Sequence, residues 1–462
     1  MGEILKAYIV PHPPIIIPEI GKGEESAVSS TIAAYHEVGK QIKDLAPDVI
    51  ILTTPHGPAY SDYIHISPGS TLKGSFKNFG APEIALELNS ETSLVDNIVQ
   101  MARTYGIEAG KDGSDGDALD HGALVPLYFI TQYYKDFTLI RISIAGLSLE
   151  QLYTFGYSIQ KAVLDYDKKV VLIGSGDLSH RLTKEGPYGF APEGPVFDEY
   201  LVETIKSVDF KKLINIDGSL SYKAGECGLR SFAIIAGSLN GFGVKSNILS
   251  YEGPFGVGYM VAELSIGGQD LSRDFFSFFE NKHKSDIEVT RKAEDPYVAL
   301  ARSSLEHYIK KGKILDVPDF LPSEMIEQCK GVFVSIKKHG QLRGCIGTIS
   351  PVTNNVAEEI IQNAVSAGTR DPRFNPVKEF ELKDLVYSVD ILEMPEPVMS
   401  IEELDVLRYG IIVSSGYKRG LLLPNLESVD TPEQQVEIAL SKAGIAKGEK
   451  FSMERFEVIR HR

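Results

Sequence analysis

Short apolar runs alternate with helix-like patterns over the first 265 residues of the chain. The runs are rich in Val, Ile and Leu without polar alternation, which is typical of strands buried on both faces of a parallel sheet. They predict strands at 5–10, 48–54, 137–145, 169–174, 245–251 and 257–265. Helical periodicity predicts helices at 26–45, 91–104, 149–166, 196–206 and 227–240. This alternation predicts an α/β domain with a mainly parallel sheet and helices on both of its faces.

A polar, charged segment at 268–295 ends this pattern. We interpret it as a linker whose clustered phenylalanines pack on one of two domains, which would span 1–267 and 296–462. In the second domain, a predicted helix at 296–312 precedes several strand-like runs, and Thr431 has the features of the N-cap of a last helix. The second domain is therefore expected to be smaller and of the α+β class.

Length and composition restrict the class of protein. A chain of 462 residues has room for about two or three domains. A net charge of −16 without a large Lys/Arg cluster argues against nucleic-acid binding, which requires cations against phosphates. Its 3 cysteines are too few for a disulfide framework, and no apolar run reaches the roughly 20 residues of a membrane helix. We expect a cytoplasmic protein that binds neither nucleic acid nor membrane, and the acidic composition is compatible with a homo-oligomer.

Four of the ten histidines occupy similar positions in the sequence. His12, His56, His121 and His180 each precede Pro, Gly or another turn-prone residue, and three of them follow an apolar run of the buried-strand type. Ligands of open α/β sheets bind outside the carboxyl ends of the strands. Several imidazoles at that edge indicate one shared site, and imidazole is the commonest metal ligand. The sequence therefore predicts a metal site.

The first two histidines are the strongest candidate ligands, because His12 and His56 end two separate predicted strands. Two histidines and one carboxylate typically hold Fe(II) in oxygenases. Glu226 and Glu252 are the candidate carboxylates, and we favour Glu226 because it lies at a predicted helix start, where the helix dipole stabilises negative charge. Cys227 could supply a thiolate instead, and this softer ligand would favour copper or zinc.

The other two histidines are candidates for catalysis. His121 follows Asp120, and His180 shares a turn with Asp177. A neighbouring carboxylate can orient an imidazole and raise its basicity. Either histidine is therefore suited to act as a general base near neutral pH.

Five short motifs occur in the order PHPP, TPHGP, DHG, GSGDLSH and GEC before a helix, within residues 5–265. Their order resembles that of the class III extradiol dioxygenases, the LigB-like superfamily, and of the Memo proteins that share their fold. The resemblance implies that His12, His56 and Glu226 bind Fe(II). It further implies that His180 deprotonates a catechol-type diol and that His121 assists O₂ activation or binds the substrate. Memo-type members place a cysteine near the third-ligand position, and GEC offers both residues.

The second domain resembles AMMECR1 in the motifs LRGCIGT, RDPRFNP, GLLLPN and FSMERFEVIRH. In such fusions the resemblance implies joint action with a separate radical-SAM protein, which is an expected partner. Cys345 lies two residues after Arg343, and a nearby cation lowers the pKa of a thiol. The alternative is a buried structural cysteine, the commoner state of a free cysteine.

Two functional hypotheses follow. In the first, the chain is an Fe(II)-dependent extradiol dioxygenase that opens the ring of a small aromatic diol with O₂. In the second, the chain is a Memo-like metal-binding or redox module, with iron, zinc or copper, that acts with a radical-SAM partner. A pocket that has lost its metal and serves as a scaffold is a third alternative.

Overall fold

The computed structural model describes residues 2–113, 118–338, 340–426 and 429–462. The chain forms two compact units, Met1–Glu280 and Asn281–Arg462, and each is a separate body with its own core. The boundary lies within helix α10 (Phe275–Ala293), so much of the segment expected to link the domains is helical. Phe275, Phe276 and Phe279 of this helix are buried in a core of the first unit.

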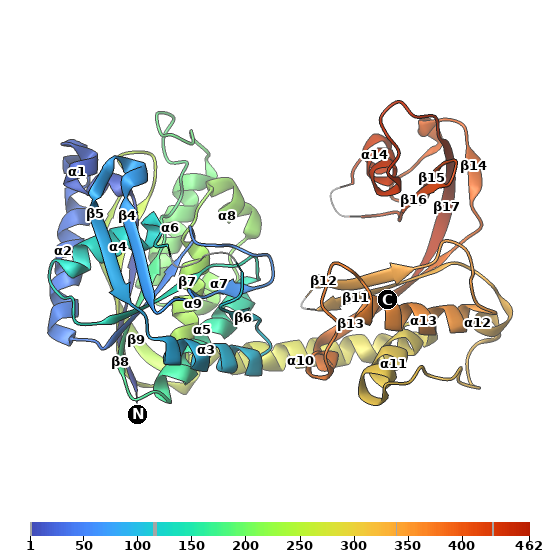
Figure 1. Ribbon diagram of the computed structural model, residues 1–462, viewed down its shortest axis with the longest axis horizontal. Coiled ribbons are helices and arrows are strands. Elements are labelled where there is room, and N and C mark those ends of the chain that lie inside the picture. The colour runs from blue at the N-terminus through green and yellow to red at the C-terminus, as the bar shows by residue number, and fades with distance from the viewer. Residues whose placement is uncertain (1, 114–117, 339, 427–428) are drawn as a thin grey trace. The chain divides into compact units, whose positions relative to one another are not determined.

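The first unit, coloured from blue to yellow in Figure 1, is built on a six-stranded sheet. The order of its strands is β7-β2-β8-β1-β10-β9. The first four strands in this order are parallel, whereas β10 and β9 pair antiparallel at the other edge. The strands are β1 (Glu3–Val10), β2 (Val49–Thr54), β7 (Thr138–Ser143), β8 (Lys169–Ser175), β9 (Phe242–Glu252) and β10 (Tyr259–Gln269). The predicted mainly parallel sheet is confirmed, and all six predicted strands are present.

Two hydrophobic cores cover the two faces of this sheet. In β2, Ile51 packs into one core, whereas Ile50 and Leu52 pack into the other. This burial on both faces explains why the strand sequences do not alternate. Helices α3 (Thr92–Thr104), α5 (Leu149–Leu164) and α9 (Leu229–Ser238) contribute to the first core, and α2 (Ser29–Leu45) and α4 (His121–Thr131) contribute to the second.

Several elements of the first unit were not predicted. One is a hairpin of β4 (Thr71–Phe76) and β5 (Ala81–Asn89). Another is helix α4, which is buried nearly all round and therefore lacks the polar stripe that produces a helical period. After β8 come α6 (Glu193–Lys206), α7 (Phe210–Ile214) and α8 (Gly218–Ala224), of which only α6 had been predicted.

The second unit contains a seven-stranded antiparallel sheet in the order β12-β11-β13-β17-β15-β16, with β14 paired to β17. The strands are β11 (Val332–Lys338), β12 (Gln341–Gly347), β13 (Leu385–Leu392), β14 (Glu396–Val398), β15 (Tyr409–Ser415), β16 (Lys418–Leu422) and β17 (Ser452–His461). Helices α11 (Pro296–Lys311) and α13 (Val356–Thr369) share one core with this sheet, and α14 (Pro432–Ala443) shares another. Thr431 caps α14 as predicted. The antiparallel sheet with separate helices agrees with the expected α+β class. None of the described helices combines the length and apolar character needed to cross a membrane.

Candidate metal centre

Three neighbouring parallel strands bring polar side chains to one edge of the first sheet. His12 follows β1, His56 follows β2, and Asp177 and His180 follow β8. Cys227 comes from the turn that precedes helix α9. Residues far apart in sequence therefore meet at the carboxyl ends of β1, β8 and β2, where open α/β sheets bind ligands.

Five of these side chains form two overlapping sets of potential metal ligands. The donor atoms of His12, His56 and Cys227 all lie within 4.8 Å of one another, and so do those of Asp177, His180 and Cys227. His12 Nε2 is 2.9 Å from His56 Nε2 and 3.7 Å from Cys227 Sγ. The Cys227 thiol belongs to both sets and therefore lies at the centre of the cluster.

Hydrogen bonds hold His12 in one tautomer. The carbonyl of Gly122 can only accept, so the hydroxyl of Ser175 donates its single proton to it across 2.5 Å. The Ser175 oxygen must then accept from His12 Nδ1, which lies 2.9 Å away. With its proton on Nδ1, His12 presents the Nε2 lone pair to His56 and Cys227. Outer hydrogen bonds orient metal-binding histidines in the same way.

His121 lies against His56 at the start of helix α4. Their ring centroids are 4.0 Å apart, and the rings stack with an angle of 30° between their planes. Asp120, which was expected to orient His121, instead caps α4 and accepts a hydrogen bond of 2.6 Å from Thr54 Oγ1. The structure thus brings His121 into the cluster as a neighbour of His56.

His180 faces the cluster with an unused nitrogen. Its Nε2 is buried and has no hydrogen-bond partner among the described residues, and its ring packs on Tyr188 with centroids 5.1 Å apart. Asp177, which was expected to orient His180, accepts a hydrogen bond of 2.8 Å from the backbone nitrogen of His12. The Nε2 atom of His180 is therefore available to accept a proton.

Burial sets the protonation of the cluster. It lowers the pKa of His12 well below the usual range, reinforced by the neighbouring histidines, and it also lowers the pKa of His56. Burial, with His56 nearby, lowers the pKa of His121 and of His180 to about 4. The raised basicity expected from Asp120 and Asp177 is therefore wrong, because burial outweighs any effect of the carboxylates. At neutral pH all four imidazoles are therefore neutral and able to donate a lone pair. Burial raises the pKa of the Cys227 thiol well above its usual range, an effect that a bound cation would oppose.

The candidate carboxylates lie outside both donor sets. Glu226 Oε2 accepts a hydrogen bond of 2.7 Å from the backbone nitrogen of Leu229, in the first turn of α9. Burial raises the pKa of this carboxyl to about 7. Glu252 Oε1 accepts a hydrogen bond of 2.7 Å from the backbone nitrogen of Thr31. Among the described residues, the third donor beside His12 and His56 is Cys227, which the sequence offered as the alternative.

The donor set fits a transition metal. Neutral imidazoles and a thiolate are ligands that zinc, copper and iron accept, whereas calcium and magnesium prefer oxygen. His12 is already oriented for this role through Ser175, a residue that sequence reasoning did not select. Its signal was present in GSGDLSH, at the end of the β8 strand.

Burial is the main influence on the pKa of the Cys345 thiol in the second unit. Burial raises its pKa, although a hydrogen bond of 3.2 Å from Ser335 Oγ acts in the opposite direction. Arg343, expected to lower the pKa, forms an ion pair of 2.9 Å with Glu381. The backbone nitrogen of Cys345 donates to Asp371 across 2.9 Å. These contacts favour the structural interpretation of this cysteine.

The fold and the cluster define the first unit as an α/β protein with potential metal ligands at the carboxyl edge of a parallel sheet. Residues 6–262 match the family model LigB, described as the catalytic LigB subunit of aromatic ring-opening dioxygenase. The match covers more than half of the chain, and the chain belongs to this family. Residues 298–461 match the AMMECR1 family model. Both resemblances drawn from the sequence motifs are confirmed.

One similar protein matches the whole chain, and others match about a third of it. A protein of Clostridium acetobutylicum is 45% identical over 98% of both chains. A protein of Thermotoga maritima is 47% identical over 36% of this chain and 98% of its own length. A solved structure, an uncharacterized protein from Pyrococcus horikoshii, is 31% identical over 37% of this chain and 90% of its own, with a TM-score of 0.34. The match to the Clostridium protein extends over both units.

Proposed function

We propose that the chain is a transition-metal-dependent oxidoreductase that opens the ring of a small aromatic diol with O₂. The observation that carries the proposal is the set of His12, His56 and Cys227 donor atoms within 4.8 Å, at the ligand-binding edge of a LigB-family sheet. Both atoms of O₂ enter the ring-opened product, so the reaction needs no separate reductant.

In this proposal His12, His56 and Cys227 hold the ion. A bound ferrous ion would supply a template and a Lewis acid for the diol and O₂. The three ligands must be deprotonated, and the two imidazoles already are, because burial keeps them neutral. Only the Cys227 thiol has to lose a proton. Zinc and copper also suit a thiolate, so the identity of the metal is tested separately from the site.

His180 is the proposed base for a substrate hydroxyl. Its buried Nε2 has no partner among the described residues, and its pKa of about 4 leaves it unprotonated at neutral pH. His121, stacked on His56, is proposed to contact the diol or O₂. The ring centroids of Phe79 and His121 are 5.4 Å apart, and the ring of Tyr188 packs on that of His180. A partly exposed aromatic ring therefore lies next to each of the two imidazoles. An aromatic substrate suits these surroundings.

A second candidate function is a metal-binding redox module that acts with a separate radical-SAM protein. The observation that favours it is the thiol of Cys227 in the place where ferrous oxygenases carry a carboxylate. The AMMECR1 domain is then the proposed docking part for the partner.

The metal site is tested by elemental analysis of the full chain purified without oxygen. We expect about one metal ion per chain, lost in His12→Ala and in Cys227→Ser. The variants Glu226→Gln and His307→Gln are matched controls, because Glu226 lies outside both donor sets and His307 lies in the second unit. Full metal content in Cys227→Ser, or its loss in Glu226→Gln, would contradict the proposed ligands.

The reaction is tested by O₂ uptake with a panel of catechols after loading with Fe(II). The dioxygenase proposal predicts one O₂ consumed per ring opened, and His180→Gln should reduce the rate by about 10²- to 10⁴-fold while metal content stays unchanged. Metal-loaded protein that takes up no O₂ with any diol would refute the dioxygenase and leave the redox module.

A further inference from the structure

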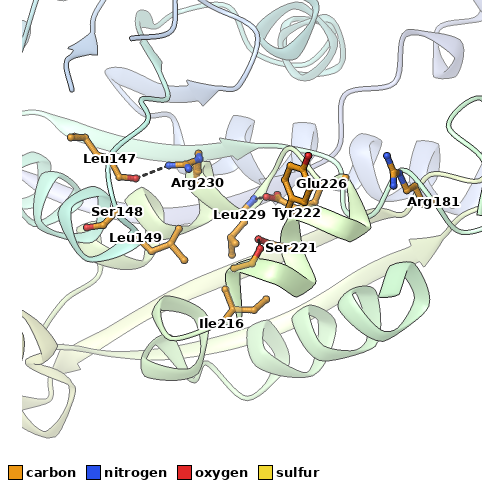
Figure 2. A pocket seen from close by; sticks show the side chains of 12 residues that line it. Leu147, Ser148, Leu149, Arg181, Ile216, Ser221, Tyr222, Glu226, Leu229 and Arg230 are labelled. Atoms are coloured by element: carbon orange, nitrogen blue, oxygen red, sulfur yellow. Dashed lines mark hydrogen bonds between the residues drawn. The ribbon is translucent and has the colours of Figure 1, made fainter. Parts of the chain in front are cut away.

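A cavity in the first unit has chain neighbours of the candidate metal ligands among the residues that line it. Figure 2 shows the side chains that line this cavity. Its volume is about 780 Å³, within the range of small-molecule sites. Apolar side chains line part of it, namely Leu147, Leu149, Ile216 and Leu229. Tyr222 of helix α8 adds an aromatic ring that is largely exposed. The apolar part of this open cavity can therefore contact the hydrocarbon part of a ligand.

Two turns separate this cavity from the metal-ligand cluster. In the turn after β8, His180 belongs to the donor cluster and the next residue, Arg181, lines the cavity. In the turn before α9, Cys227 belongs to the cluster and the preceding residue, Glu226, lines the cavity. In each turn, one residue belongs to the metal-ligand cluster and the residue next to it lines the cavity. None of the residues of either donor set lines the cavity.

The charges in the cavity are unequally paired. Arg230 Nη1 is held by the carbonyls of Leu147 and Ala145, at 2.6 and 3.0 Å. The carboxylate of Glu226 is engaged by the backbone of α9 and interacts electrostatically with Arg230. Arg181 is exposed, and its guanidinium has neither an ion pair nor a side-chain hydrogen bond with any described residue. Two guanidinium groups thus face a single carboxyl group, so Arg181 is left as a positive charge without a partner in the described part of the chain.

We infer that this cavity binds a small organic monocarboxylate. Arg181 pairs with the carboxylate in the forked geometry that guanidinium groups offer, and the apolar wall holds the hydrocarbon part. Arg181 offers one unpaired guanidinium, which matches a monoanion, whereas a phosphate dianion would also face the carboxyl group of Glu226. The inference rests on the cavity alone and holds whatever ion or reaction the metal centre has.

The test uses the absence of tryptophan from the chain. The substitution Tyr222→Trp places a single indole at the cavity, and its fluorescence in the full-length protein reports titration with benzoate. Benzamide is the neutral control of the same shape, and phenyl phosphate is the dianionic one. We expect saturable binding of benzoate that is at least about tenfold tighter than that of either control. Benzamide loses the charge-assisted hydrogen bond, and phenyl phosphate adds an unfavourable second negative charge.

Three further variants, in the same background, locate the ligand. Arg181→Gln should weaken benzoate binding about tenfold, and Ser221→Phe should block it by filling the cavity. Arg103→Gln, an exposed arginine on α3, and His12→Ala should leave it unchanged. Equal binding of benzoate and benzamide, no effect of Arg181→Gln, or no saturation up to about 10 mM would overturn the inference. Loss of binding in His12→Ala would place the carboxylate at the metal centre instead and would also overturn it.

Discussion

Replacing Ser175 by alanine removes the hydroxyl that fixes the tautomer of His12. In the structure, His12 Nδ1 donates to Ser175 Oγ at 2.9 Å, and Ser175 donates to Gly122 at 2.5 Å. His12 is only 2% exposed, so water does not readily replace the lost acceptor. An unsatisfied buried polar group costs about 1–3 kcal/mol, which for a unit of this size lowers the melting temperature by roughly 2–10 °C. Loss of an outer partner of a metal-bound histidine typically weakens metal binding by about 10- to 100-fold.

The assay measures metal affinity of the full chain by competition with a chelator, together with thermal unfolding of the metal-free protein. Ser231→Ala is the matched control, because Ser231 is a fully buried serine whose hydroxyl has no hydrogen-bond partner among the described residues. The control should keep both its affinity and its melting temperature. If Ser175→Ala keeps its metal affinity within about twofold of wild type, the Ser175 hydroxyl does not hold His12 for metal binding.

Three further predictions concern stability. In metal-free protein, the pKa of His180 is about 4 against an ordinary 6.5, so its contribution to the free energy of unfolding falls as the pH drops between these values. Urea unfolding at about pH 7 and pH 5 measures how far the free energy of unfolding drops over this range. The drop should be about 1–2 kcal/mol smaller in His180→Gln than in wild type, and equal drops would contradict the prediction. Glu359→Gln should lower the free energy of unfolding of the second unit by about 3 kcal/mol in the same measurement, because this buried carboxylate accepts hydrogen bonds from Thr348, Val352 and Thr353. Thr431→Ala should cost about 1 kcal/mol through loss of the α14 cap, and an unchanged unfolding midpoint would contradict that role.

The strands and their histidines could be predicted from the sequence because the signals are local. A strand such as β2 is an unbroken apolar run, since both faces of the sheet are covered, and a polar residue just after it must lie at the sheet edge. His12, His56 and His180 were placed near one another on that basis, and the structure brings them together. Helix α4 gave no such signal, because a helix buried on all sides has no polar stripe.

Which of Glu226 and Cys227 has its donor atom near His12 and His56 could not be predicted, because it depends on the directions of two adjacent side chains. Glu226 and Cys227 lie in one turn, and a sequence pattern places both at the start of α9. The helix dipole does favour a carboxylate at this position, but the carboxylate binds the backbone of the helix start. The carboxylate accepts a hydrogen bond from the backbone nitrogen of Leu229, a group that the helix start leaves without a partner, and lies outside both donor sets. The helix itself uses the carboxylate, and the thiol of Cys227 is left to face His12.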